Sequence, residues 1–387
     1  MLLAQKGFVF TSKEELLEMV ERGVTLYVEM EDTDAYHRAF VGKLHSLVRE
    51  EKSLGQIAGA QVSLDDLDAG KIDQVKGPPD WLDLQAQANS ILRDSTSSQF
   101  LRRLGRLQSH LRQYTLRNPD GALFALFHLS ASSSASELRL YSATHAMLVS
   151  VMCGLAAREV LNWNAELEQT LCLAALTMNL SMTELQDRLA LQLEPPSPAQ
   201  QTEIAQHAPR SVQLLSQVGV SDQSWLEAVR DHHTVPPGVL AGRPEGQRLA
   251  RLIQRADMFA ARLAPRASRV PTSPAAAMQA SYFDENSQVD EAGAALIKAV
   301  GIYSPGSYVR LSTNEVAVVI RRGPNTTTPR VAVVINREGL PTVEPTIRDT
   351  SLREYRIVAS VPHRDVKVQL NLQRMLALTT ASSSDRL

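Results

Sequence analysis

Apolar residues recur with a helical period through most of the chain between residues 138 and 300. Leucine, alanine, valine and methionine return every three or four positions, and glycines and prolines separate the periodic segments. This spacing places the apolar side chains on one face of a helix. We therefore predict helices over residues 140–161, 165–176, 183–191, 198–218, 224–233, 245–263, 271–282 and 290–300. Together they predict a mainly α-helical bundle over residues 138–303.

After residue 300 the apolar positions alternate instead. Residues 308–311, 316–320 and 331–335 are rich in β-branched side chains, and residues 355–358 offer a fourth short segment of this kind. This pattern is typical of strands. Residues 304–378 are therefore predicted to form a small antiparallel sheet, with a final helix or arm over residues 366–378. Residues 379–387 are predicted to be a disordered tail.

The N-terminal third is organised differently. Residues 1–30 read as a strand, a helix with a capping box at Ser12 and Glu15, and a second strand. Residues 31–137 are predicted to be a helical linker, with one long helical pattern over residues 81–117 and a second helix over residues 120–129. Its arginines lack interleaved aromatic residues, which favours a solvated helix face over a nucleic-acid surface.

Composition narrows the class of protein. The chain has 387 residues, 44% of them hydrophobic, and a formal net charge of −2, so no global charge attracts nucleic acid or an acidic membrane. No apolar run reaches the ~20 residues of a membrane span. The two cysteines, Cys153 and Cys172, lie in apolar segments and are interpreted as buried small hydrophobic residues. These features predict a cytoplasmic protein.

Candidate chemistry lies in the helical region. Four histidines and one aspartate that can bind a metal ion occur on its predicted helices: His145, His207, His232, His233 and Asp257. Lone histidines elsewhere in the chain carry no readable chemistry. The alternative interpretation is that these five are polar side chains satisfied by hydrogen bonds inside a closed bundle.

Six stretches of sequence, in order, resemble the HD-GYP domain, the cyclic-di-GMP phosphodiesterase branch of the HD superfamily. They are residues 141–146 (Tyr-Ser-Ala-Thr-His-Ala), 173–179 (Leu-Ala-Ala-Leu-Thr-Met-Asn), 194–209 with His207, 229–233 (Val-Arg-Asp-His-His), 249–260 with Asp257, and 301–312. The likeness covers about half of the chain. It implies an HD-type helical bundle and a site for two divalent ions such as iron or manganese. In that site a bridging carboxylate and a shared hydroxide act on phosphorus.

The departures from this resemblance fall together. Met178 and Asn179 stand where the family carries its central His-Asp pair, and Met182 stands where it carries a phosphate-contacting lysine. Tyr141 replaces the glutamate of members with a third metal. The GYP loop is reduced to residues 235–238. Asparagine supplies no negative charge and methionine is a soft, weak donor, so these changes predict a degenerate site without efficient turnover.

Three functions stay open. The first is an inactive HD-GYP-like protein of bacterial cyclic-di-GMP signalling that binds nucleotide or protein partners. The second is a phosphohydrolase that uses a single metal, and the third is a structural interaction scaffold. The resemblance implies as partners cyclic-di-GMP, signalling proteins such as diguanylate cyclases, or a second copy of the chain. The cofactor is predicted to be either none or one iron or manganese ion, and neither nucleic acid nor a membrane is expected as a partner.

Overall fold

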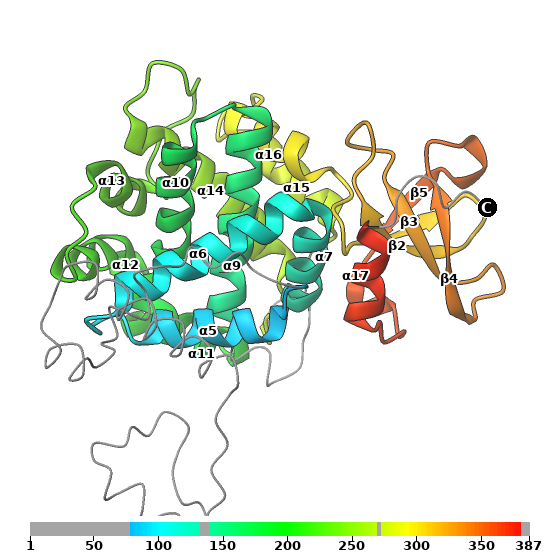
Figure 1. Ribbon diagram of the computed structural model, residues 1–387, viewed down its shortest axis with the longest axis horizontal. Coiled ribbons are helices and arrows are strands. Elements are labelled where there is room, and N and C mark those ends of the chain that lie inside the picture. The colour runs from blue at the N-terminus through cyan, green and yellow to red at the C-terminus, as the bar shows by residue number, and fades with distance from the viewer. Residues whose placement is uncertain (1–77, 132–139, 269–271, 381–387) are drawn as a thin grey trace, which may run out of the picture. The chain divides into compact units, whose positions relative to one another are not determined.

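The computed structural model describes residues 78–131, 140–268 and 272–380, which all belong to one compact unit, Gly77–Leu387. The predictions for residues 1–77, including the strand-helix-strand unit over residues 1–30, lie outside the described residues. So do residues 132–137 of the predicted linker and all but two residues of the predicted tail. The described chain is mostly helical and ends in a small antiparallel sheet (Figure 1).

Helices make up most of the described chain between residues 81 and 300 and pack as one bundle (Figure 1). They are α5 (Trp81–Arg93), α6 (Phe100–Arg117), α7 (Pro119–Ser130), α9 (Tyr141–Leu155), α10 (Ala165–Thr177), α11 (Thr183–Leu191), α12 (Pro198–Gln217), α13 (Gln223–Asp231), α14 (Glu245–Leu263), α15 (Pro274–Tyr282) and α16 (Glu291–Val300). The predicted helices over residues 183–191 and 245–263 have these same bounds in the structure.

Helix α9 is the centre of the bundle. Every one of its residues is buried, and it contacts α5, α6, α7, α10, α11, α14 and α16. A helix that is apolar all round is stable only in such a surrounding. Its first turn has no capping side chain of its own. Instead, Asp187 of α11 accepts a hydrogen bond from the backbone N–H of Ser142 at 2.8 Å.

Three details of the helical prediction are corrected. The pattern over residues 81–117 forms two helices, because residues 94–99 turn the chain between α5 and α6. The segment predicted as one helix over residues 140–161 changes to a π-helical turn, η1, at Ala156–Val160. The helix predicted over residues 224–233 ends at Asp231, so His232 and His233 follow α13 instead of lying within it.

The C-terminal sheet has five strands in the order β4-β3-β2-β1-β5, and every neighbouring pair is antiparallel. The strands are β1 (Tyr308–Leu311), β2 (Val316–Arg321), β3 (Arg330–Ile335), β4 (Pro341–Asp349) and β5 (Ile357–Val361). The sequence prediction missed β4 entirely and placed β5 two residues too early. Helix α17 (Leu372–Thr380) follows, and its last two residues lie in the segment predicted as a tail.

Both faces of the sheet are covered. Val316, Val318 and Ile320 of β2 face one apolar cluster that includes Phe124 of α7 and Met375 of α17. The intervening residues of β2 face a second cluster on the other side. This alternation is the period of a strand. The sheet therefore packs on the bundle through α7 and α17 (Figure 1).

Two remaining predictions concern membrane-spanning helices and the two cysteines. Among the described helices, none combines the length and the apolar character needed to cross a lipid bilayer. Cys153 and Cys172 are both buried and free, as their apolar surroundings predict.

Candidate metal centre

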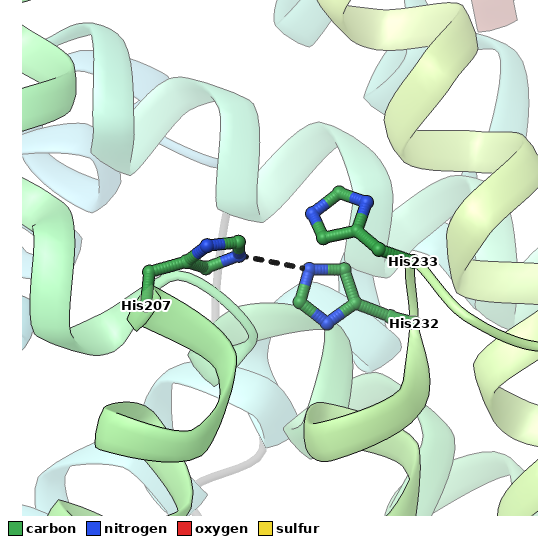
Figure 2. Close-up of side chains that lie close together, drawn as sticks. All are labelled: His207, His232 and His233. Carbon is green, nitrogen blue, oxygen red and sulfur yellow. Dashed lines mark hydrogen bonds between the residues drawn. The ribbon is translucent and has the colours of Figure 1, made fainter. Parts of the chain in front are cut away.

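Three of the five predicted side chains meet at one place in the bundle. His207 lies in the middle of α12, which begins with a capping box formed by Ser197 and Gln200. His232 and His233 come directly after α13, and their rings point toward His207 across a short gap (Figure 2). Within the described part of the chain, these three form the single group of His, Cys, Asp or Glu side chains that could share an ion. Their ligand atoms all lie within 4.8 Å of one another.

The rings stand at an angle to one another. The ring centroids of His207 and His232 are 5.2 Å apart, those of His207 and His233 are 5.1 Å apart, and those of His232 and His233 are 4.0 Å apart. The Nε2 atom of His207 is 3.2 Å from the Nε2 atom of His232 (Figure 2). The close approach is thus made by nitrogen atoms and not by the carbon edges of the rings.

The hydrogen bonds of the two Nδ1 atoms show which form of each ring takes part in this contact. Nδ1 of His207 lies 2.5 Å from the carbonyl oxygen of Ile204, and Nδ1 of His232 lies 2.7 Å from the carbonyl oxygen of Val229. A carbonyl only accepts, so each Nδ1 donates its hydrogen. In a neutral ring the Nε2 atom then carries a lone pair, and two lone pairs face each other. In metal sites, a hydrogen bond from the other ring nitrogen to a backbone carbonyl orients the histidine in the same way.

The surroundings of His207 and His232 favour the neutral form of both rings. Burial lowers the pKa of His232 to about 3, with a smaller lowering by the charges of His233 and His207. Burial also lowers the pKa of His207. His232 has no exposed surface, whereas His233 is exposed. A neutral imidazole is the form that binds a metal ion, so the pair is ready to act as ligands at neutral pH.

The other two predicted residues form a pair of their own. His145, in the second turn of α9, places its Nε2 atom 2.7 Å from Oδ1 of Asp257 on α14. Burial favours the neutral carboxyl, but the hydrogen bond and charge of His145 hold the pKa of Asp257 well below its usual range. The charges of His232 and His233 act in the same direction. Asp257 therefore lies within electrostatic reach of the three-histidine group, although the group does not include it.

The segment that departs from the family pattern lies between these two sets. Met178 and Asn179 line a small cavity together with His145. Ser181 donates its hydroxyl to the carbonyl oxygen of His207 at 2.8 Å, which ties the same segment to α12. Met178 is buried among apolar residues. Met182 is half-buried at the end of the 3-10 turn η2 (Leu180–Met182). Met178 and Asn179 thus lie beside His145, and the segment that follows them contacts α12.

Two further sequence-predicted departures have clear surroundings. Tyr141 stacks on His145, with ring centroids 5.7 Å apart and an interplanar angle of 9°, and its hydroxyl accepts a hydrogen bond from Arg266 at 2.9 Å. The shortened loop over residues 235–238 is closed by Arg243, which donates to the carbonyl oxygens of Pro236 and Pro237 at 3.0 and 2.9 Å.

This arrangement fits one ion and lacks the parts for two. Three imidazoles match the number of protein ligands in a mononuclear site of the zinc or iron type. The C-terminal end of α13, which carries partial negative charge, lies directly before His232 and favours a cation there. A second ion needs a bridging carboxylate, and the group of three contains none.

Sequence reasoning missed the side chains that support the site. Ser181 and Gln254 donate to the carbonyl oxygens of His207 and His233, and Ser211 of α12 accepts a hydrogen bond from the backbone N–H of Ser181. The sequence did contain one signal for such supporting residues, namely a polar residue on the buried face of an amphipathic helix. Arg251 in α14 is the clearest example.

No family model, curated protein or solved structure matches this chain.

Proposed function

We propose that this protein is a catalytically inactive relative of the HD-GYP phosphodiesterases. In this proposal it acts in bacterial cyclic-di-GMP signalling by binding nucleotide or protein partners, and its helical bundle holds at most one iron or manganese ion. The proposal combines the resemblance of six sequence segments with the contacts that the structure gives to the same residues.

The observation that carries the proposal is the pairing of His145 with Asp257 beside Met178 and Asn179. In a site with two ions, a carboxylate bridges both ions and a shared hydroxide attacks phosphorus. Here the carboxylate of Asp257 is hydrogen-bonded to His145, and the neighbouring position that would supply a bridging carboxylate is the amide Asn179. Even a modest enzyme lowers its barrier by ~8 kcal/mol or more. The amide of Asn179 and the thioether of Met178 carry no charge that could stabilise the transition state and lower the barrier in this way.

The test is to supply everything that an active enzyme would need. Purified full-length protein is incubated with cyclic-di-GMP and Mn²⁺ or Fe²⁺, and linear product is measured. We expect the same product level as in buffer, together with binding of cyclic-di-GMP in calorimetry. Cleavage that is abolished by His232→Ala would show that the protein is an enzyme after all. No binding of the nucleotide would leave a protein scaffold as its role.

A second candidate function is a phosphohydrolase with one metal ion. The exposed ring of His233 favours it, because an ion held by His207, His232 and His233 would have one side open to solvent and substrate. Such an ion lowers the pKa of a bound water and makes a nucleophile. This candidate predicts one equivalent of metal per chain and metal-dependent cleavage of a simple phosphodiester. Metal binding without any cleavage supports the inactive protein.

A further inference from the structure

The backbone that carries His232 and His233 is held by a helix to which it does not belong. Gln254 of α14 donates from Nε2 to the carbonyl oxygen of His233 at 3.3 Å. One turn earlier on the same helix, Arg251 donates from Nη1 to the carbonyl oxygen of Val235 at 2.9 Å. Residues 232–235 lie beyond the last hydrogen-bonded turn of α13, so these two contacts supplement the turn that Thr234 and Val235 make back to Asp231.

Arg251 is itself held in one orientation. Its side chain is completely buried, and its Nε donates to Oδ2 of Asp290 at 2.9 Å. Its Nη2 donates to Oε2 of Glu285 at 2.9 Å. Asp290 is also fixed, because its other oxygen caps α16 at the N–H of Gly293. A planar guanidinium with both edges occupied cannot rotate without breaking several charge-assisted bonds.

The orientation of Arg251 is passed on to Gln254. Nη1 of Arg251 donates to the Oε1 atom of Gln254 at 2.7 Å. Since the amide oxygen faces Arg251, the amide nitrogen is the atom left to face His233. A chain of hydrogen bonds therefore runs from Asp290 through Arg251 and Gln254 to the carbonyl of His233.

We infer that Arg251 and Gln254 are positioning residues that set the direction in which His232 and His233 present their imidazoles. The same helix also carries Asp257, one turn after Gln254. This inference rests on the metal binding described under the proposed function. Mutating a partner that orients a metal-binding histidine typically weakens metal affinity about 10- to 100-fold.

The decisive variant is Gln254→Met in the full-length protein. Methionine has a similar length and a high helix propensity, but it neither donates to His233 nor accepts from Arg251. Arg251 keeps its bonds to Asp290, Glu285 and Val235, so the buried ion network stays intact. Gln247→Met is the matched control, since Gln247 is exposed on the same helix. Replacing Arg251 itself would remove the nearest cationic partner of the buried carboxylate of Asp290 and would disturb folding.

Two measurements are made on wild type and both variants. Titration with Co²⁺ gives the dissociation constant and the visible absorption spectrum, which reports ligand geometry. Hydrogen exchange of the metal-free protein gives the protection of the amides of Thr234 and Val235. For Gln254→Met we expect about tenfold weaker Co²⁺ binding, an altered spectrum and faster exchange at these two amides. The thermal stability of Gln254→Met should match that of Gln247→Met. If Gln254 had only a structural role, its replacement would lower thermal stability and leave Co²⁺ binding unchanged.

The outcomes separate the two claims. Equal Co²⁺ affinity, spectrum and exchange in all three proteins would overturn the positioning role. Faster exchange in Gln254→Met without Co²⁺ binding by wild type would retain the positioning role and refute the metal site. Weaker binding in both methionine variants would also overturn the inference, because the effect would not be specific to Gln254.

Discussion

Trp225 donates its indole N–H to the hydroxyl oxygen of Thr177 across 2.9 Å. Thr177 is the last residue of α10, and Trp225 lies in α13. The hydroxyl donates its own hydrogen to the carbonyl oxygen of Leu173 at 2.8 Å, so the polar groups of both side chains in this contact are satisfied. This bond fixes the end of the helix before Met178 relative to the helix before His232. The replaced positions therefore keep a defined place beside the histidines.

The fixed place of residues 178 and 179 predicts the result of a repair. The double variant Met178→His with Asn179→Asp restores an imidazole and a carboxylate next to His145, so its metal content should rise to two equivalents. Met178 is buried, and an unligated histidine there will lower the stability of the metal-free protein. Elemental analysis after loading with Mn²⁺ or Fe²⁺, and the thermal shift on loading, check both effects. The single variant Asn179→Asp serves as the control. Unchanged metal content would show that these side chains do not reach the site.

Gly306 lies at a position where an added methyl group should lower the stability of the fold. Its φ of +91° disfavours any other residue, and a Cβ atom would stand 2.9 Å from Cβ of Phe127 and 3.0 Å from the carbonyl oxygen of Phe124. Gly306→Ala should lower the free energy of unfolding by about 2–4 kcal/mol, from backbone strain and overpacking together. Gly339→Ala is the control, since Gly339 has a φ of +83° but nothing within 4 Å of the added atom. Its cost should be about 1 kcal/mol. Equal losses in urea unfolding would contradict the close approach.

Arg322 joins the sheet to the bundle. Its guanidinium lies 2.7 Å from Oδ1 of Asp120 in α7 and 2.8 Å from Oε2 of Glu159 in η1. Because Arg322 and Asp120 are largely buried, Arg322→Met leaves the carboxylate of Asp120 poorly compensated and should cost about 2–3 kcal/mol in unfolding free energy. Arg330→Met removes a more exposed pair with Asp349 and should cost less than about 1 kcal/mol. A smaller loss at position 322 than at position 330 would show that the sheet does not depend on this junction.

His363 predicts a loss of stability in mild acid. Burial lowers its pKa to about 4, with a further lowering by the charge of His128, and its ring packs against Tyr308 at 4.7 Å. The imidazole takes up a proton near pH 6.5 in the unfolded chain but only near pH 4 in the folded chain. Above pH 6.5 the ring is neutral in both states, so it costs no stability there. Between these values the folded state should lose up to about 3 kcal/mol. Urea unfolding from pH 7 to pH 4 of wild type and His363→Gln measures the difference. Parallel pH profiles would refute this assignment.

Most helices followed from the sequence because their own side chains determine them. Helix α14 has apolar residues at helical spacing, and its bounds could be read directly. The end of α13 could not, because the turn after Asp231 depends on bonds from Gln254 and Arg251 on another helix. The sequence likewise grouped five candidate metal ligands. It could not show that His145 and Asp257 bind each other, because that contact joins residues 112 positions apart.

Strand β4 was missed for a related reason. It contains Pro341 and Pro345 and exposes Val343, so it shows neither the alternation nor the β-branched run of a typical strand. Its pairing with β3 defines it as a strand, and local sequence does not report that pairing. Proline on an edge strand also removes donors that another chain could use.

The two-sided burial of β2 has a consequence for how the sheet finds its alignment. In most sheets a slip by one residue moves polar side chains into the core, and this penalty selects the correct pairing. A slip of β2 would only exchange Val316, Val318 and Ile320 for Ala317 and Val319, which are equally apolar. Side-chain volume and the irregular pairings at the ends of β2 must therefore select the alignment during folding. Substitutions that alter size at Ala317 will test this selection more severely than those that alter polarity at the exposed edges.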